Sequence, residues 1–189
     1  MPDTASLAPR PTTPSRKRFT GEEVLALIAK GALAGDRVEL LDGEIWEMAS
    51  EGPPHGRLAV WLNKWLILNA PAGVSVACER TIRLADAHWP EPDFFLFPER
   101  LHVDEVRGAD VLLLIEIADT SLQDDLTVKG PKYREYGVRE YWVIDLGARV
   151  THVHRLDGAW PEEPPVPFDA PLRPAHLAGL ELILAEAGV

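Results

Sequence analysis

An apolar run broken by one carboxylate constrains this chain more than any other feature. Residues 111–118 read Val-Leu-Leu-Leu-Ile-Glu-Ile-Ala, so Glu116 lies in an otherwise apolar stretch. Such a run predicts a strand that is buried on both faces of a sheet. A carboxylate is costly there unless another group pairs with it or the strand already ends in solvent. Glu116 is therefore either a strand-end residue, a member of an ion pair or part of a site.

The residues before this run predict two helices and several strands. Thr20 to Glu23 has the pattern of a capping box and predicts that a helix begins there. Residues 37–49 predict a β-hairpin around Asp42-Gly43, a dipeptide that suits a tight turn with positive φ. Apolar residues at helical spacing predict a helix over 55–69, and residues 74–84 and 92–97 predict extended chain.

The residues after the run continue the alternation of helices and strands. A helix is predicted over 125–136, where Pro131 requires a late start or a kink. Strands are predicted over 140–145 and 150–156. Residues 157–174 contain six prolines and predict an irregular segment, and 178–187 predict a short apolar element, for which a helix is one reading. This order predicts an α/β fold with a central mixed sheet flanked by helices, preceded by a helix and a hairpin.

Length and composition limit the number of domains and the classes of protein to which this chain can belong. A chain of 189 residues fits one domain, expected over 19–189, after a flexible leader at 1–18 that is rich in Pro, Ser and Thr. No apolar run reaches the ~18 residues of a membrane span, and the leader has no apolar segment typical of a secretion signal, so a cytoplasmic protein without membrane contact is expected. Cys78 is the only cysteine, which excludes an intrachain disulfide, and a buried thiol is expected.

The net charge of -11 limits the choice of partner. An acidic chain repels phosphate at long range, so the charge counts against tight, non-specific DNA binding. Bound divalent cations would neutralise local carboxylates, and basic residues could gather on one face. The charge is therefore compatible with a metal site.

Two carboxylates beside apolar strands form the strongest candidate site. Asp93 precedes Phe94-Phe95-Leu96-Phe97, and Glu116 lies near the end of the next apolar run. Each alone has an ordinary alternative, as a turn acid or a strand-end acid. Together they offer the oxygen ligands that Mg²⁺ prefers, and such a site can polarise a phosphoryl oxygen and activate water.

Three further side chains are candidates for the same site. Lys129, on the following helix, can stabilise negative charge on a phosphate, although Lys132 lies on a similar helix face and a solvated lysine is the simpler reading. His55 begins the second helix and can bind phosphate or assist proton transfer. Glu39, on the hairpin, can add a ligand. Phosphate-binding glycine loops and the nucleophile motif Gly-x-Ser-x-Gly are absent from the sequence.

At this point the chain resembles a known family. The resemblance to the putative restriction endonuclease family, a bacterial group in the PD-(D/E)xK nuclease superfamily, extends over about residues 19–156. It is carried by the segments Glu39–Glu44, His55, Pro92-Asp93, Ile115–Ile117, Asp125–Lys129, Tyr133 and Gly137–Asp145.

The resemblance implies a restriction-endonuclease-like fold in which Asp93 and Glu116 hold the metal. The superfamily places a lysine two residues after the second acid, where this chain has Ala118, and Lys129 on the next helix matches a displaced lysine. The resulting hypothesis is a nuclease that uses Mg²⁺ or Mn²⁺ and cleaves nucleic acid, with DNA preferred and a homodimer as an option. The alternatives are a non-catalytic binding or regulatory protein on the nuclease fold and a hydrolase of small phosphoesters.

Overall fold

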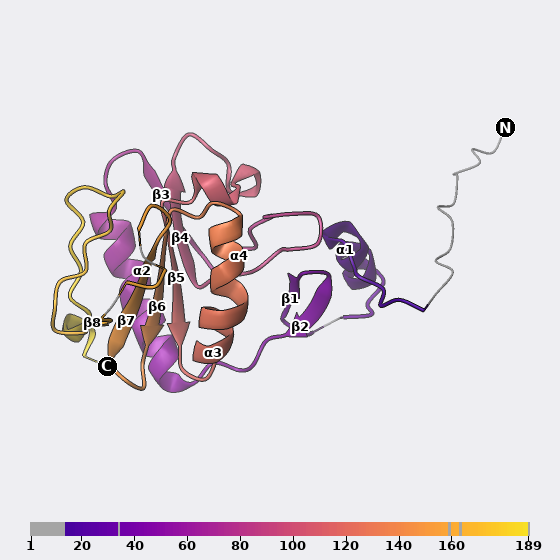
Figure 1. Ribbon diagram of the computed structural model, residues 1–189, viewed down its shortest axis with the longest axis horizontal. Coiled ribbons are helices and arrows are strands. Elements are labelled where there is room, and N and C mark those ends of the chain that lie inside the picture. The colour runs from indigo at the N-terminus through magenta and orange to yellow at the C-terminus, as the bar shows by residue number, and fades with distance from the viewer. Residues whose placement is uncertain (1–13, 34, 159, 163, 189) are drawn as a thin grey trace.

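A six-stranded mixed sheet forms the centre of the protein (Figure 1). The computed structural model describes residues 14–33, 35–158, 160–162 and 164–188, so most of the expected leader lies outside the described residues. The sheet contains, in spatial order, β3 (Val74–Cys78), β4 (Phe94–Pro98), β5 (Leu113–Ala118), β6 (Glu140–Asp145), β7 (Val150–Arg155) and β8 (Val166–Pro167). Only β5 and β6 are parallel, and the other neighbouring pairs are antiparallel. The predicted α/β fold with a mixed sheet is confirmed.

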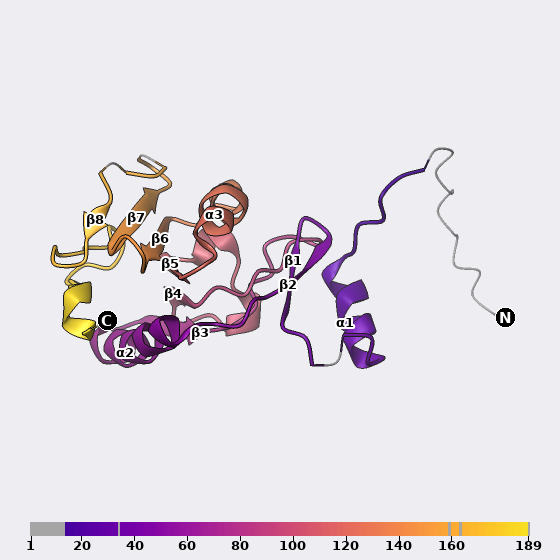
Figure 2. The same ribbon diagram turned by 90° about the horizontal axis from the view of Figure 1, so that it is seen from below.

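Helices cover both faces of this sheet (Figure 2). One face packs against α2 (Pro53–Asn69), and the other packs against the helical stretch that contains α3 (Leu122–Asp124) and α4 (Gly130–Glu135). Side chains alternate between the two faces because successive residues of a strand point in opposite directions. Phe94 and Leu96 belong to the core under α2, whereas Phe95 and Phe97 belong to the core on the other side.

The N-terminal helix and hairpin lie beside the sheet and not within it (Figure 1). The capping box that Thr20 and Glu23 form starts α1 (Gly21–Ala29), as predicted. Asp42 and Gly43 have φ angles of 51° and 79° and join β1 (Val38–Leu41) to β2 (Glu44–Glu47). The hairpin is held by the chain after β3, where the Trp89 amide donates to the Leu40 carbonyl at 2.7 Å.

The contact between the hairpin and the chain after β3 explains why one strand is shorter than the sequence predicted. The extended segment predicted over 74–84 ends as a strand at Cys78. Glu79 then adopts a φ of 49°, and the chain leaves the sheet and runs to the hairpin. Cys78 itself is partly exposed, so the expectation of a buried thiol is wrong.

The helix after β5 runs through Pro131 without ending. A π-helical turn, Asp125–Lys129, connects α3 to α4, and Pro131 lies at the start of α4. Because proline has no amide hydrogen, it cannot complete the usual bond to the carbonyl four residues earlier. Wider π turns accommodate such an interruption and occur often at functional sites. The helix predicted over 125–136 is confirmed, but it starts earlier, at Leu122, so the late start offered for Pro131 is wrong.

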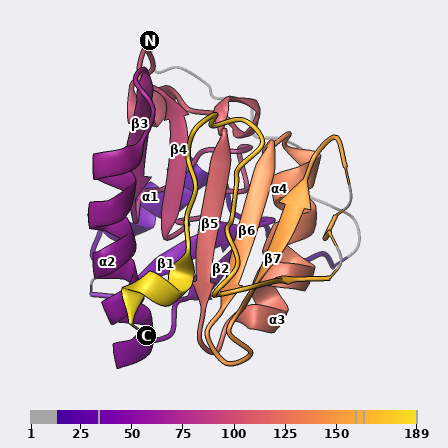
Figure 3. The same cartoon turned by 90° about the vertical axis from the view of Figure 1, so that its left-hand side faces the viewer.

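The C-terminal segment crosses the sheet on the side of α2 (Figure 3). Its apolar side chains, among them Phe168, Leu172 and Leu184, complete that core. The proline-rich segment is irregular apart from β8, and the helix considered over 178–187 is only the 3-10 turn Leu184–Ala187. Two further 3-10 turns, Val103–Glu105 and Gly108–Asp110, precede β5. No helix in the described part of the chain is long and apolar enough to cross a membrane.

A buried carboxylate ties the C-terminal segment to the sheet. Glu140 is fully buried and accepts hydrogen bonds from the Trp142 indole at 2.8 Å and the Ala175 amide at 2.7 Å. Arg155 lies 3.2 Å away and balances its charge.

Glu140→Ala leaves these groups without their acceptor, so it should lower the free energy of unfolding by about 3 kcal/mol, measured by urea denaturation. Glu181→Ala, which removes an exposed pair with Arg173, is the control and should change it by less than about 1 kcal/mol.

Candidate active site

The antiparallel pairing of β4 and β5 brings Asp93 and Glu116 together. Phe94 pairs with Ile115, so the residue before β4 lies beside the next residue of β5. The Asp93 amide donates to Glu116 Oε2 at 3.3 Å, and the Ile117 amide donates to Asp93 Oδ2 at 2.6 Å. The backbone of each strand therefore holds the carboxylate of the other.

Glu116 points toward the helical stretch that carries Lys129. It lies on the same side of β5 as Leu114 and Ala118, the face that packs under that stretch. Lys129 Nζ donates to Glu116 Oε1 at 3.2 Å, and the Tyr133 hydroxyl donates to the same oxygen at 3.0 Å. Lys132 instead pairs with Asp42 and Glu135 nearer the surface, so Lys129 is the lysine beside the two acids.

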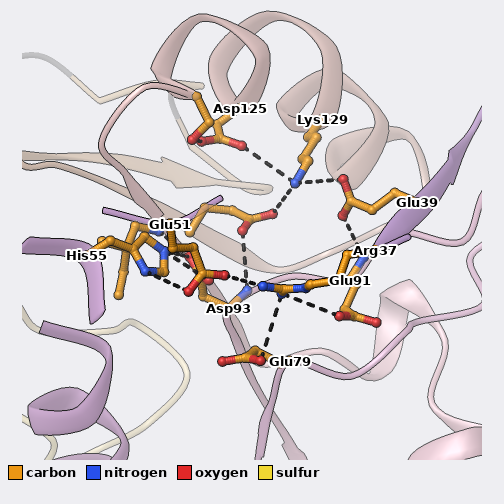
Figure 4. A network of polar contacts seen from close by, with 12 residues as sticks. Arg37, Glu39, Glu51, His55, Glu79, Glu91, Asp93, Asp125 and Lys129 are labelled. Carbon is orange, nitrogen blue, oxygen red and sulfur yellow. Dashed lines mark hydrogen bonds and ion pairs between the residues drawn. The ribbon is translucent and has the colours of Figure 1, made fainter. Parts of the chain in front are cut away.

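Two more carboxylates surround the Lys129 ammonium (Figure 4). Glu39 of β1 lies 3.1 Å from Nζ, and Asp125, one turn earlier on the helix, lies 3.7 Å from it. Glu39 also accepts from the Glu91 amide at 2.7 Å, which fixes its carboxylate. The hairpin, the sheet and the helix thus each supply a carboxylate to one ammonium.

His55 lies on the other side of Asp93, between two acids (Figure 4). Its Nε2 is 3.2 Å from Asp93 Oδ1, and its Nδ1 is 3.3 Å from Glu51 Oε2. Glu51 is held by Arg37, whose guanidinium lies 2.6 Å from Oε1. Donor atoms of Glu51, His55 and Asp93 all lie within 4.8 Å of one another, so these three residues could hold a cation.

Burial and charge shift the titration of these groups. Burial raises the pKa of the Glu116 carboxyl well above its usual value, and Lys129 opposes that shift. Burial likewise raises the pKa of Asp125 to about 6, against the opposing effect of Lys129. Burial alone would lower the pKa of Lys129, but Glu116, Glu39 and Asp125 outweigh it and raise that pKa above its usual value. Lys129 is therefore a permanent cation in a site where carboxyl groups hold protons more strongly than usual.

The site opens into a pocket of about 410 Å³. All five residues singled out from the sequence, Glu39, His55, Asp93, Glu116 and Lys129, line it. The described lining residues include eight acids and, as bases, Lys129 and His55. The acids are Glu39, Glu47, Glu51, Asp93, Glu116, Asp119, Asp124 and Asp125. Apolar side chains of the hairpin, among them Trp46 and Met48, form part of the wall.

Sequence reasoning missed Glu51, Asp125 and Tyr133 as members of the site. Tyr133 follows Lys129 by four residues, a spacing that places both on one helix face, so the sequence carried a signal for it. Glu51 lies in the loop before α2, and its place beside His55 depends on Arg37 of the hairpin. No local pattern distinguishes Glu51 from a solvated loop acid.

Comparisons with known proteins identify the family and the fold of the chain. A sequence model of the family described as Putative restriction endonuclease matches residues 22–185. A solved structure, a putative nuclease belonging to DUF820 from Anabaena variabilis, aligns with a TM-score of 0.65. The alignment covers 89% of this chain and 97% of that protein at 17% sequence identity, which shows a shared fold. No curated protein matches the chain.

The raised pKa of Asp125 predicts a specific pH dependence of stability in the metal-free protein. Its folded pKa, about 6, lies above the ordinary value of 3.8, so the folded state binds the extra proton. The resulting stabilisation is fully present below pH 3.8 and is lost as pH rises through about 6. Asp125→Asn removes this loss, so the stability of the variant relative to the parent should increase from pH 4 to pH 7, by about 1–3 kcal/mol.

Urea denaturation in the presence of a chelator measures this difference. Asp124→Asn, at the exposed neighbouring position, is the matched control and should show no such increase. Equal pH profiles for Asp125→Asn and the parent would contradict the prediction.

Proposed function

Because the chain belongs to the putative restriction endonuclease family, we propose that it hydrolyses phosphodiester bonds in nucleic acid, with DNA as the substrate, using a divalent cation. The observation that carries the proposal is the contact among Asp93, Glu116 and Lys129. The two acids meet through the backbone bonds of β4 and β5, and Lys129 reaches Glu116 from a separate helix. Three elements therefore converge on one carboxylate pair inside a pocket.

The donor set suits a hard divalent cation. Glu116 Oε2 accepts only the 3.3 Å bond from the Asp93 amide among the bonds described, so it retains capacity for a ligand. Both Asp93 oxygens face His55 Nε2, and Oδ2 also accepts from the Ile117 amide. Carboxylate oxygens are the ligands that Mg²⁺ and Mn²⁺ prefer, and the excess of acids over bases in the pocket favours bound positive charge. We therefore assign Asp93 and Glu116 as the residues that would hold Mg²⁺ or Mn²⁺.

The remaining residues have separate roles in this proposal. A cation held by the two acids would polarise a phosphoryl oxygen and favour deprotonation of water. The Lys129 ammonium would stabilise the charge that develops on the phosphate, because its neighbours keep it protonated. Glu39 would orient Lys129, and His55 would orient Asp93, since each contacts its partner at 3.1–3.2 Å.

The acidic pocket favours a second candidate, hydrolysis of small phosphoesters. Eight of the described lining residues are acids, whereas a polynucleotide groove usually carries a stripe of bases. A cavity of about 410 Å³ lies within the usual size range for small-ligand sites. The chemistry at Asp93 and Glu116 would be the same, and only the length of the substrate would differ.

Loss of the two acids should abolish cleavage. With Mg²⁺ or Mn²⁺ present, the parent should cleave plasmid or single-stranded DNA, and Asp93→Asn and Glu116→Gln should reduce the rate by at least about 100-fold. Lys129→Met should cause a loss of similar size, whereas the matched surface variant Lys132→Met should retain the parent rate. Gel electrophoresis measures the rates, and circular dichroism checks that each variant folds.

The same preparations separate the alternatives. Cleavage that persists in Asp93→Asn would refute the site. Hydrolysis of bis(p-nitrophenyl) phosphate without cleavage of DNA or RNA would support the small-substrate enzyme. Failure on every phosphodiester would support a non-catalytic binding protein. The expected homodimer stays a prediction, which light scattering tests.

A further inference from the structure

We propose that Trp46 forms the wall of a nucleobase-binding subsite beside the candidate active site, and that the preferred substrate is therefore single-stranded DNA. This inference rests on the proposed function and deepens it, since it names the form of nucleic acid that the site takes. Asp93, Glu116 and Lys129 would act on the phosphate, and Trp46 would hold the base next to it.

The register of the hairpin places Trp46 beside the residue that contacts Lys129. Trp46 of β2 pairs with Glu39 of β1, and directly opposite residues of an antiparallel pair project from the same face. The Cα atoms of such pairs are about 4.5–5.5 Å apart. Glu39 lies 3.1 Å from Lys129 Nζ, so the indole lies next to the carboxylate that holds this ammonium. One hairpin thus supplies both a contact to the cation of the site and an aromatic wall.

Two more apolar side chains extend this wall. Residues two apart on a strand share a face, so Leu41 and Met48 lie on the same side of the hairpin as Trp46. All three line the pocket, whereas Ile45, on the opposite face, is not among its described lining residues. An apolar strip therefore faces a pocket that is otherwise rich in acids. A nucleotide has matching parts, because it joins a charged phosphate to a flat base.

The Trp46 ring has no packing partner of its own in the part of the chain that the structure describes. It belongs to neither hydrophobic core, and no described aromatic ring or cation stacks on it. The other five tryptophans each pack against another ring, an arginine or the core: Trp61, Trp65, Trp89, Trp142 and Trp160. A partly exposed indole that lines a pocket without such a partner is available to a ligand.

The charge of the pocket makes a stacking surface useful. Proteins that bind nucleic acid commonly gain affinity from lysine and arginine on phosphates. Here the described lining residues include eight acids and, as bases, only Lys129 and His55. Bound cations would attract the phosphate that is cleaved, but they do not distinguish a nucleotide from a free phosphate. Stacking of a base on an aromatic ring supplies affinity that does not depend on the phosphate charge.

The size of the pocket favours a single strand over a duplex. A volume of about 410 Å³ suits one small ligand, so it can take one base with its sugar and phosphate but not stacked base pairs. A base in a duplex must first leave its pair and its stack, which costs free energy, whereas this cost is least for a base that is already single-stranded. Every base has an aromatic face, so the subsite should accept all four bases.

Calorimetry in the presence of Mn²⁺ tests the subsite with deoxyadenosine 5′-monophosphate and 2-deoxyribose 5-phosphate. Both carry the same phosphate, and neither contains a phosphodiester that the proposed reaction could cleave. The parent should bind the ligand that has a base about 5- to 150-fold more tightly. Trp46→Ala should abolish this difference, and Trp46→Phe should retain most of it. Ile45→Ala, a matched change on the opposite face of the same strand, should leave it unchanged.

Cleavage of one oligonucleotide, supplied as a single strand and as a duplex, tests the form of the substrate. The parent should cleave the single strand at least about 10-fold faster, because the duplex must first release a base. Trp46→Ala should lower kcat/KM on the single strand, whereas Ile45→Ala should retain the parent value. Equal rates of the parent on the two forms would overturn the preference for single strands.

The binding results decide the subsite independently of cleavage. Equal affinity of the parent for both ligands, no binding of either, or a preference that survives in a folded Trp46→Ala protein would overturn it. If Trp46→Ala does not fold, Trp46→Leu, which keeps an apolar side chain but has no aromatic face, replaces it. Cleavage of DNA without base-dependent binding would leave the nuclease proposal standing and refute this one. Base-dependent binding without cleavage of any phosphodiester would support the subsite and refute the proposed hydrolysis.

Discussion

The interaction on which the site depends is the neutralisation of buried carboxylates by the Lys129 ammonium. Glu39, Glu116 and Asp125 all lie within 4 Å of Nζ, and all three are at least 95% buried. Ionised carboxylates are expensive to bury unless they are paired and hydrogen-bonded. Because they come from the hairpin, the sheet and the helix, the pairing also fixes how these elements meet. A change at this ammonium therefore affects the fold as well as the chemistry.

The irregular helix explains how one lysine reaches all three acids. Pro131 cannot donate a hydrogen bond to the preceding turn, and residues Asp125–Lys129 form a π turn immediately before it. This turn keeps Asp125 beside Lys129, and Tyr133, on the following turn, reaches the same Glu116 oxygen. Ala118, at the position where the superfamily places its lysine, packs in the core instead. Lys129 thus reaches Glu116 from the helix and not from the strand.

Much of this arrangement was predictable because buried acids leave a clear trace in an apolar sequence. Asp93 and Glu116 interrupt or border apolar strands, and the antiparallel register of those strands then brings them together. Capping and turn residues likewise predicted α1 and the β1–β2 hairpin correctly. The extent of β3 and the form of the C-terminal segment were less predictable. Both depend on contacts with distant chain, such as Leu40 with Trp89 and Leu172 with Leu182.

The acidic pocket poses a physical problem for the phosphodiester substrate proposed above, because its carboxylates repel phosphate. Lys129 already offsets part of the charge of its three acids, so it cannot also balance Asp93, Asp119 and Asp124, which line the same pocket. A phosphate entering this pocket without cations would meet net repulsion. Cations bound at Asp93 would reverse the local sign of the field, because a divalent ion is the largest charge in such a site. Substrate binding and metal binding should therefore be coupled in this protein. Under the proposed function, the same acids that would repel nucleic acid in the absence of metal would, with cations bound, hold the charge that attracts it.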